Sequence, residues 1–378
     1  MRTGYGQPVR IVVAPDEFKE SLTAVSAARA IVLGWRTHAP NDDFDVCPLS
    51  DGGSGFVDTL HAALGGELLA CVVTGPTGDP VPATILRAGS TAYVESAQAC
   101  GLHLIAGSDR DPTVTTTFGV GELIEAAIGS GAQRIVVGLG GSGTHDGGAG
   151  MLAALGARAD VELTQGGGSL AAITSIDIEP ARRRCAGVKL FAATDVDSPL
   201  VGVTGAARAF AAQKGADEND IMRLEGAMQS LRAAVGRRSS DGKDPALALG
   251  AGAAGGLAYG LLHLGAQRVA GIDTVMTAVG FRERVARADV VVTGEGLFDW
   301  QSLRGKVVTG VANAALEQAR PCVVIAGDVV VGRREYSAIG VNSAYSVAQI
   351  VGSVSASLAD PIDSLTLAAR RVAQTWSN

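Results

Sequence analysis

Runs of β-branched residues alternate with helical stripes at the start of the chain. The run 10–14 (RIVVA) predicts a buried strand. Apolar residues at positions 22, 25, 28, 32 and 35 recur every three or four residues and predict a helix over 22–35. A second strand over 45–49 and a second helix over 55–64 follow. This order of strand, helix, strand and helix is typical of the opening of a parallel α/β sheet.

The same rhythm returns near the end of the chain. Strands are predicted over 288–293, 322–326 and 344–351. A last helix begins at Pro361, with Asp360 as its N-cap, and its apolar stripe runs to Trp376 at spacings of three and four.

The pattern between these two segments is more mixed. Two short strands are predicted within 71–95, and a helix over 119–130 leads to a strand over 134–139. A glycine-rich loop over 140–148, a strand over 189–193 and alanine-rich helices near 217–236 and 252–264 follow. We therefore predict one parallel α/β domain built from both ends of the chain, with a second domain inserted between them.

Glycine is unusually frequent, with 51 residues, or about 13% of the chain against an average of about 7%. Because glycine weakens the interiors of helices and strands, this excess indicates turns and loops that approach a ligand closely. The net charge of −7 argues against nucleic acid as a partner, since phosphate backbones attract basic surfaces. Small anionic ligands stay compatible, because they need only a few cations or backbone N–H groups.

Signals for export or membrane insertion are missing from the sequence. The apolar run in MRTGYGQPVRIVVAPDE is too short for a signal peptide, and no window of ~18 apolar residues exists. The five cysteines are widely spaced and form no C-x-x-C pair, which is typical of reduced thiols. We therefore expect a cytoplasmic protein without a membrane partner.

Charged residues gather directly after the predicted strands, where ligands bind in an open α/β sheet. The residues at these positions are Asp16, Lys19, Asp51, Asp195, Asp197, Glu295, Asp299, Gln301 and Lys306, together with the glycine-rich loop 140–148. Transfer of a phosphoryl group from ATP requires such a set: lysines and backbone N–H groups bind phosphates, carboxylates hold Mg²⁺, and one carboxylate takes the hydroxyl proton. No Walker A motif is present, so a P-loop enzyme is excluded.

Structural explanations stay open for several of these residues. An aspartate after a strand is often a helix N-cap or part of an Asx turn. Lys306 could simply begin a helix, and the segment 250–256 (GAGAAGG) could mark close packing of helices.

A dinucleotide-binding domain is the main alternative. Gly138, Gly140 and Gly143 match G-x-G-x-x-G after a strand, and Asp160 follows at the distance of a ribose-binding acid. The protein would then be an NAD(P)-dependent oxidoreductase of a small hydroxy acid. This alternative leaves Asp195 and Glu295 without a role.

Nine ordered segments make the chain resemble a known family. They are APDEFKESL (14–22), DGGSG (51–55), TGPTGDPV (74–81), TTTFGVGELI (115–124), GLGGSGTHDGGAGMLAALGA (138–157), ATDVDSPLVG (193–202), QKGA (213–216), GAGAAGGL (250–257) and TGEGLFDWQSLRGKV (293–307). In this order they are similar to the bacterial glycerate kinase family, of the class that usually makes 2-phosphoglycerate, over nearly the whole chain.

The resemblance implies a fold, a reaction and a site. The fold would be a flavodoxin-like parallel-sheet domain over 1–70 and 286–378 and an inserted mixed α/β domain over 71–285, with the active site in the cleft between them. ATP with Mg²⁺ would phosphorylate D-glycerate to 2-phosphoglycerate. Substrate or phosphate would be bound by Asp16, Ser21, Asp51, Gly140, Gly141, Ser142, Asp146, Asp299, Gln301 and Lys306.

The catalytic assignments follow from the same segments. We assign Asp195 as the general base, because it stands at a strand end beside a second carboxylate. Lys19 and Asp197 are the further catalytic residues, and Asp197 and Glu295 are the expected ligands of Mg²⁺.

Several positions depart from the usual pattern of the family, among them Val307 and Val308, where a proline is usual. Ser54 stands where DGGEG has its glutamate, His145 stands where asparagine is usual, and Trp300 stands where glycine is usual. These residues keep a third hypothesis open, a retuned paralogue that binds without turnover. A homo-oligomer is also open, because the alanine-rich helices could pack within the inserted domain or against a second subunit.

Overall fold

The computed structural model describes residues 8–19, 21–236 and 243–377. The chain forms two compact units. The first comprises Met1–Asp51, Asp58–Gly65 and Ile272–Asn378, and the second comprises Gly52–Val57 and Gly66–Gly271. Both ends of the chain therefore belong to the first unit, and the middle of the chain forms most of the second.

The first unit contains a five-stranded sheet in which all neighbours are parallel. Its order is β15-β13-β11-β1-β2. The strands are β1 (Arg10–Val13), β2 (Asp43–Val46), β11 (Val290–Thr293), β13 (Cys322–Ala326) and β15 (Val341–Ser346). Numbered within the unit, this is the flavodoxin-like order 2-1-3-4-5 read from the β2 edge. The predicted parallel-sheet fold built from both chain ends is confirmed.

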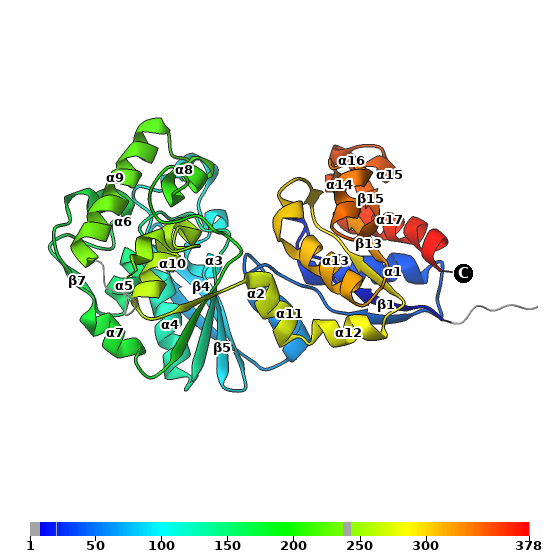
Figure 1. Ribbon diagram of the computed structural model, residues 1–378, viewed down its shortest axis with the longest axis horizontal. Coiled ribbons are helices and arrows are strands. Elements are labelled where there is room, and N and C mark those ends of the chain that lie inside the picture. The colour runs from blue at the N-terminus through cyan, green and yellow to red at the C-terminus, as the bar shows by residue number, and fades with distance from the viewer. Residues whose placement is uncertain (1–7, 20, 237–242, 378) are drawn as a thin grey trace, which may run out of the picture. The chain divides into compact units, whose positions relative to one another are not determined.

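Valine and isoleucine fill both faces of the three central strands, β1, β11 and β13, because helices cover each face of the sheet. On one face, Ile11, Val292 and Ile325 pack in one core with α1 (Ala24–Arg36) and α17 (Pro361–Trp376). Side chains alternate along a strand, and α13 (Val307–Glu317) and α12 (Phe281–Arg287) contact the sheet on its other face. Figure 1 shows α1, in blue, and α17, in red, lying side by side.

The second unit contains a six-stranded mixed sheet in the order β10-β9-β6-β5-β4-β3. β3 (Glu67–Thr74), β4 (Pro80–Ala88) and β5 (Thr91–Glu95) form an antiparallel meander. β6 (Arg134–Gly138), β9 (Lys189–Ala193) and β10 (Gln267–Val269) extend it in parallel. One large core joins this sheet to α4 (Phe118–Gly129), α5 (Ala149–Ala154), α9 (Glu218–Val235) and α10 (Ala253–His263).

Shorter elements connect these layers. They are α2 (Phe56–Leu64), α3 (Ala97–Cys100), α6 (Gly166–Ser169), α7 (Glu179–Cys185), α8 (Ala206–Phe210), α11 (Gly271–Ala278), α14 (Arg333–Ala338), α15 (Val347–Val351), α16 (Val354–Ala359), β7 (Arg158–Ala159), β8 (Ile176–Asp177), β12 (Leu297–Phe298) and β14 (Asp328–Val329). Of these, only α2 was predicted, over 55–64, and its bounds match closely.

Two predicted strands are wrong at both ends, since those predicted over 45–49 and 344–351 are β2 (Asp43–Val46) and β15 (Val341–Ser346). β2 stops at Val46, so residues 47–49 lie in the loop that follows it. The strand predicted over 344–351 ends at Ser346, because residues 347–351 form α15. Ser346 caps this helix, and its hydroxyl oxygen accepts a hydrogen bond from the N–H of Gln349 at 3.1 Å. The apolar run there was ambiguous between strand and helix.

The cysteines form no disulfide, and four of the five are buried. Over the ranges that the structure describes, no helix has both the length and the apolar character that a membrane crossing needs.

Close contact between α1 and α17 depends on Gly34. An ideal Cβ at this position would lie 2.0 Å from the carbonyl oxygen of Thr366. Gly34→Ala should therefore lower the free energy of unfolding by about 1–3 kcal/mol, as overpacked sites do. Denaturation in urea, followed by circular dichroism, measures the change.

Gly226→Ala in α9 is the matched control, because no atom lies within 4 Å of an ideal Cβ there. Alanine is the better helix former, so this variant should gain up to about 1 kcal/mol. Similar effects of the two substitutions would contradict the tight contact at Gly34.

Candidate active site

Backbone hydrogen bonds join the loops that follow β1, β2 and β11. The N–H of Asp16 donates to the carbonyl of Gly294 at 2.8 Å, and the N–H of Leu49 donates to the carbonyl of Pro15 at 3.0 Å. Gly294 has no room for a side chain, since an ideal Cβ would lie 2.0 Å from the carbonyl oxygen of Ile325. These contacts hold three predicted site loops together at the carboxyl edge of the first sheet.

Asp16, Asp51 and Glu295 lie close enough there for their charges to interact. Burial raises the pKa of Asp16 well above its ordinary value, and the carboxylates of Asp51 and Glu295 raise it further. Burial also raises the pKa of Glu295 to about 7. A side-chain hydrogen bond with Ser302 and the charge of Lys306 oppose this rise in pKa, and Asp299 and Asp51 add to it. Positive charge brought to this cluster would therefore be strongly favoured.

Glu295 has the surroundings of a ligand-binding carboxylate. Its side chain is only 7% exposed, and its Oε1 atom has no hydrogen-bond partner among the residues that the structure describes. A buried polar atom without a partner costs free energy unless a ligand or water completes it. Mg²⁺ is commonly held by one or two carboxylates together with phosphate oxygens, so this oxygen fits such an ion.

Lys19 lies in a turn with a strained backbone. Its φ is 48°, in the left-handed region, which costs a residue with a side chain roughly 1–2 kcal/mol. The turn is closed by Ser21, whose hydroxyl donates to the carbonyl of Phe18 at 2.7 Å. Lys19 is exposed, so its ammonium group is accessible to a ligand, whereas the hydroxyl of Ser21 is engaged within the turn.

Asp299, Gln301 and Lys306 lie in the segment that precedes α13. The Oδ1 atom of Asp299 accepts from the N–H groups of Gln301 at 2.8 Å and Ser302 at 3.3 Å, which is an Asx turn. Lys306 is the N-cap of α13, and its charge lowers the pKa of Glu295. Trp300 is 58% exposed beside them. Of this group, Lys306 and Asp299 act electrostatically on the carboxylate cluster.

In the second unit, the loops after β6 and β9 begin side by side. Gly138 pairs with Ala193, and the N–H of Leu139 donates to the carbonyl of Ala193 at 2.9 Å. Gly140 packs against the main chain of Gly53, where an ideal Cβ would come within 2.6 Å of its Cα. Gly141 has a φ of 64°, which suits glycine. The glycine-rich loop is therefore fixed at the carboxyl edge of this sheet.

The buried side chain of Lys214 holds this loop by hydrogen bonds. The sequence analysis did not name Lys214 as a site residue. Its side chain is 2% exposed, and Nζ donates to Ser142 Oγ at 2.9 Å and to the carbonyl of Thr144 at 2.7 Å. Burial lowers the pKa of Lys214 to about 8. The segment QKGA was the available signal, but its lysine follows no strand.

Asp146 and His145 are both fully buried beneath the loop. The Asp146 carboxylate accepts hydrogen bonds from the N–H and hydroxyl of Thr117 and from the N–H groups of Gly148 and Gly150. These contacts indicate a positioning role for Asp146 in place of the predicted contact with substrate. Burial lowers the pKa of His145 to about 3, so its imidazole is neutral.

Asp195 and Asp197 have different surroundings. β9 ends at Ala193, so both residues lie in the following loop and not on a continued strand. Asp195 is half-buried, and its Oδ1 accepts from the N–H of Gly271 at 3.0 Å. Asp197 is exposed and forms an ion pair with Arg268 at 2.6 Å.

The dinucleotide-binding interpretation is wrong. The segment Gly138–Gly143 opens no helix, since α5 begins at Ala149. The N–H of Gly143 donates to the carbonyl of Cys100 at 2.7 Å. Asp160 accepts hydrogen bonds from the N–H groups of residues 174 and 175, as a turn residue does.

The segment 250–256 is glycine-rich because it packs closely against another part of the chain, as the structural explanation expected. An ideal Cβ at Gly255 would lie 2.1 Å from the carbonyl oxygen of Thr144, so this stretch packs its main chain against the glycine-rich loop.

Comparisons with known proteins agree with the resemblance. The glycerate kinase family matches residues 11–377. A glycerate kinase from Bacillus subtilis (strain 168) is 42% identical, with 90% of each chain covered. A glycerate 2-kinase from Escherichia coli (strain K12) is 40% identical, with 97% of this chain and 98% of the relative covered.

A crystal structure described as a glycerate kinase 2 from Salmonella typhimurium LT2 is similar in fold and sequence. Its TM-score is 0.80 at 37% identity, with 98% of each chain covered. Nearly every element described above therefore has a counterpart in a relative of known fold. The resemblance is confirmed, and the chain belongs to the glycerate kinase family.

Proposed function

We propose that this protein is an ATP-dependent kinase that phosphorylates D-glycerate at its 2-hydroxyl group. The observation that carries the proposal is the buried, unpartnered oxygen of Glu295 beside Asp16 and Asp51, which is suited to a cation that accompanies phosphate. Membership of the family supports the reaction, and similarity to a relative named glycerate 2-kinase favours the 2-hydroxyl.

The departures at Ser54, His145 and Trp300 do not favour a binding protein without turnover. His145 is enclosed in the core, away from solvent. The hydroxyl of Ser54 lies against the backbone of Gly141, 3.0 Å from the position of an ideal Cβ. Trp300 is an exposed side chain next to a turn whose hydrogen bonds are intact.

Mg²⁺ would be held chiefly by Glu295. Asp197 is the weaker of the two proposed ligands, because Arg268 already neutralises its carboxylate. The ion, when bound, neutralises charge on the phosphate oxygens of ATP. Lys19 and Lys306 would add positive charge for phosphate or for the carboxylate of glycerate, and Asp16 and Asp51 would face the same ligands.

Asp195 would act as the general base. It takes the proton of the 2-hydroxyl as that oxygen forms a bond to the γ-phosphorus of ATP and the bond from phosphorus to ADP breaks. The hydrogen bond from Gly271 N–H fixes the orientation of the carboxylate. Backbone N–H groups of Gly140, Gly141 and Ser142 would bind an anionic group, and Lys214 would position them through Ser142 and Thr144.

Incubation of the protein with ATP, Mg²⁺ and D-glycerate tests the function directly. We expect ADP release that depends on glycerate, and a phosphorus NMR spectrum of 2-phosphoglycerate. A spectrum of 3-phosphoglycerate would refute the position of attack alone. Binding of glycerate without ADP release would support the retuned paralogue.

Asp195→Asn removes the proposed base while it keeps the size of the side chain. Turnover should fall by about 10²–10⁴-fold, the usual contribution of general base catalysis. The steady-state rate of ADP release measures this, with circular dichroism as the check on folding.

Asp160→Asn is the matched control, because Asp160 only closes a turn with residues 174 and 175. Its turnover should stay close to that of the unsubstituted protein. Near-normal turnover of folded Asp195→Asn would assign the proton to another group.

Lys19→Gly should separate stability from activity. Glycine relieves the left-handed strain, so the free energy of unfolding should rise by about 1 kcal/mol. Loss of the ammonium group should at the same time raise the KM for ATP. Urea denaturation and steady-state kinetics measure the two effects, and Lys19→Ala should lose activity without gaining stability.

Lys214 should make stability depend on pH in the alkaline range. Its pKa in the folded protein is about 8, below the ordinary 10.5, so between these values the unfolded chain binds a proton that the folded protein has released. Stability from this group therefore rises with pH across that window, by at most about 1.4 kcal/mol per unit.

Lys214→Met removes this titration. The free energy of unfolding of the unsubstituted protein, minus that of Lys214→Met, should increase from pH 8 to pH 10 in urea denaturation. A constant difference would contradict the lowered pKa of the buried lysine.

A further inference from the structure

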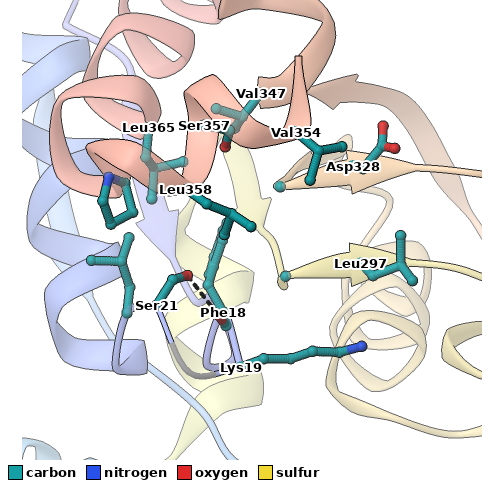
Figure 2. A pocket seen from close by; sticks show the side chains of 14 residues that line it. Phe18, Lys19, Ser21, Leu297, Asp328, Val347, Val354, Ser357, Leu358 and Leu365 are labelled. Atoms are coloured by element: carbon teal, nitrogen blue, oxygen red, sulfur yellow. Dashed lines mark hydrogen bonds between the residues drawn. The ribbon is translucent and has the colours of Figure 1, made fainter.

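The first unit contains a pocket of about 700 Å³ at the carboxyl edge of its sheet (Figure 2). Residues after four neighbouring strands line it: Phe18 and Lys19 after β1, Gly296 after β11, Gly327 after β13 and Val347 after β15. This edge of an open α/β sheet is where ligands bind, and the strand order reverses between β1 and β11.

Apolar side chains form most of the pocket wall. Figure 2 shows Val347, Val354, Leu358 and Leu365 on the side of the C-terminal helices and Phe18 on the opposite side. The polar residues in the lining are Lys19, Ser21, Asp328 and Ser357. A flat apolar ring system with a polar edge is the kind of ligand that such walls accept.

Glycerate does not match this pocket. It is a three-carbon acid with oxygen on every carbon, so it would leave the volume unfilled and the apolar wall uncovered. Adenosine matches better, because the faces of its base are apolar and its volume suits a pocket of several hundred Å³.

The pocket and the carboxylate cluster share two loops. Lys19 and Gly296 line the pocket, while Asp16 and Glu295 belong to the cluster and lie on the same loops. The aliphatic part of Lys19 packs over Gly296, whose ideal Cβ would lie 3.4 Å from Lys19 Cγ. The lysine therefore stands where a chain of phosphates would pass from the pocket toward Glu295.

We propose that this pocket binds the adenosine part of the ATP donor, with the polyphosphate passing Lys19 and Gly296 toward Glu295. The inference rests on the proposed function, and it assigns the nucleoside to the first unit and to the C-terminal helices α16 and α17.

Leu358→Trp and Val354→Trp test the proposal by filling the pocket. The two residues line it from α16 and are 59% and 51% exposed, so a larger side chain can be accommodated without disturbing the core. Each variant should raise the Kd and the KM for ATP by about ten-fold or more, while the KM for D-glycerate changes by less than about two-fold. Titration calorimetry with ATP and steady-state kinetics measure these constants.

Ile362→Trp is the matched control. Ile362 is 49% exposed on α17 and does not line the pocket, so this variant should keep both constants. Unchanged affinity for ATP in both pocket variants would overturn the proposal, as would an equal loss of affinity in Ile362→Trp.

Photolabelling of the unsubstituted protein with 8-azido-ATP gives a second test that needs no variant. The azide stands on the base, so label should appear in peptides that contain residues 16–22 or 347–365. Label confined to the second unit would overturn the proposal.

The outcomes distinguish this inference from the proposed function. Normal glycerate-dependent ADP release, together with unchanged ATP affinity in the pocket variants, would refute the pocket alone. Loss of ATP binding in those variants, in a protein that never phosphorylates glycerate, would refute the glycerate kinase reaction and leave the pocket in place.

Discussion

Both units position their loops by packing one main chain directly on another, at distances that exclude a Cβ atom. Gly294 lies against the carbonyl of Ile325 in the first unit, and Gly255 lies against that of Thr144 in the second. Each contact lets a loop at a strand end be held by backbone atoms, which leaves side chains such as Lys19 and Glu295 for a ligand. The many glycines therefore allow close contacts that position loops, at least as often as they allow tight turns of the chain.

The two units treat buried charge in opposite ways. In the first, Asp16 and Glu295 lie near Asp51, and the pKa values of Asp16 and Glu295 rise because burial and the neighbouring carboxylates favour a bound proton or cation. In the second, Lys214 is enclosed with hydrogen-bond acceptors, and its pKa falls. The carboxylates of the first unit thus favour a ligand that brings positive charge. In the second unit, the ammonium group of Lys214 holds the glycine-rich loop.

Sequence reasoning identified most of the fold, whereas the roles of the candidate site residues stay predictions. Strong β-branched runs, and Asp360 with Pro361, were read correctly because short-range patterns determine them. The segment 344–351 was misread because an apolar run fits a strand or a helix until Ser346 caps it. The hydrogen bonds of Lys214 and of the Asp146 carboxylate could not be predicted from the sequence, because they depend on burial and on residues far apart in the chain.

The first sheet is completed only when the end of the chain is available. β1 pairs with β11, which begins at Val290, and α1 is covered by α17, which begins at Pro361. At about 5–20 residues per second of synthesis, β1, β2 and α1 wait on the order of tens of seconds for these partners. The second unit, nearly continuous in the chain, can close in the meantime. Biosynthesis therefore leaves the apolar face of α1 and one edge of β1 open to chaperones, or to a neighbouring nascent chain, for most of translation.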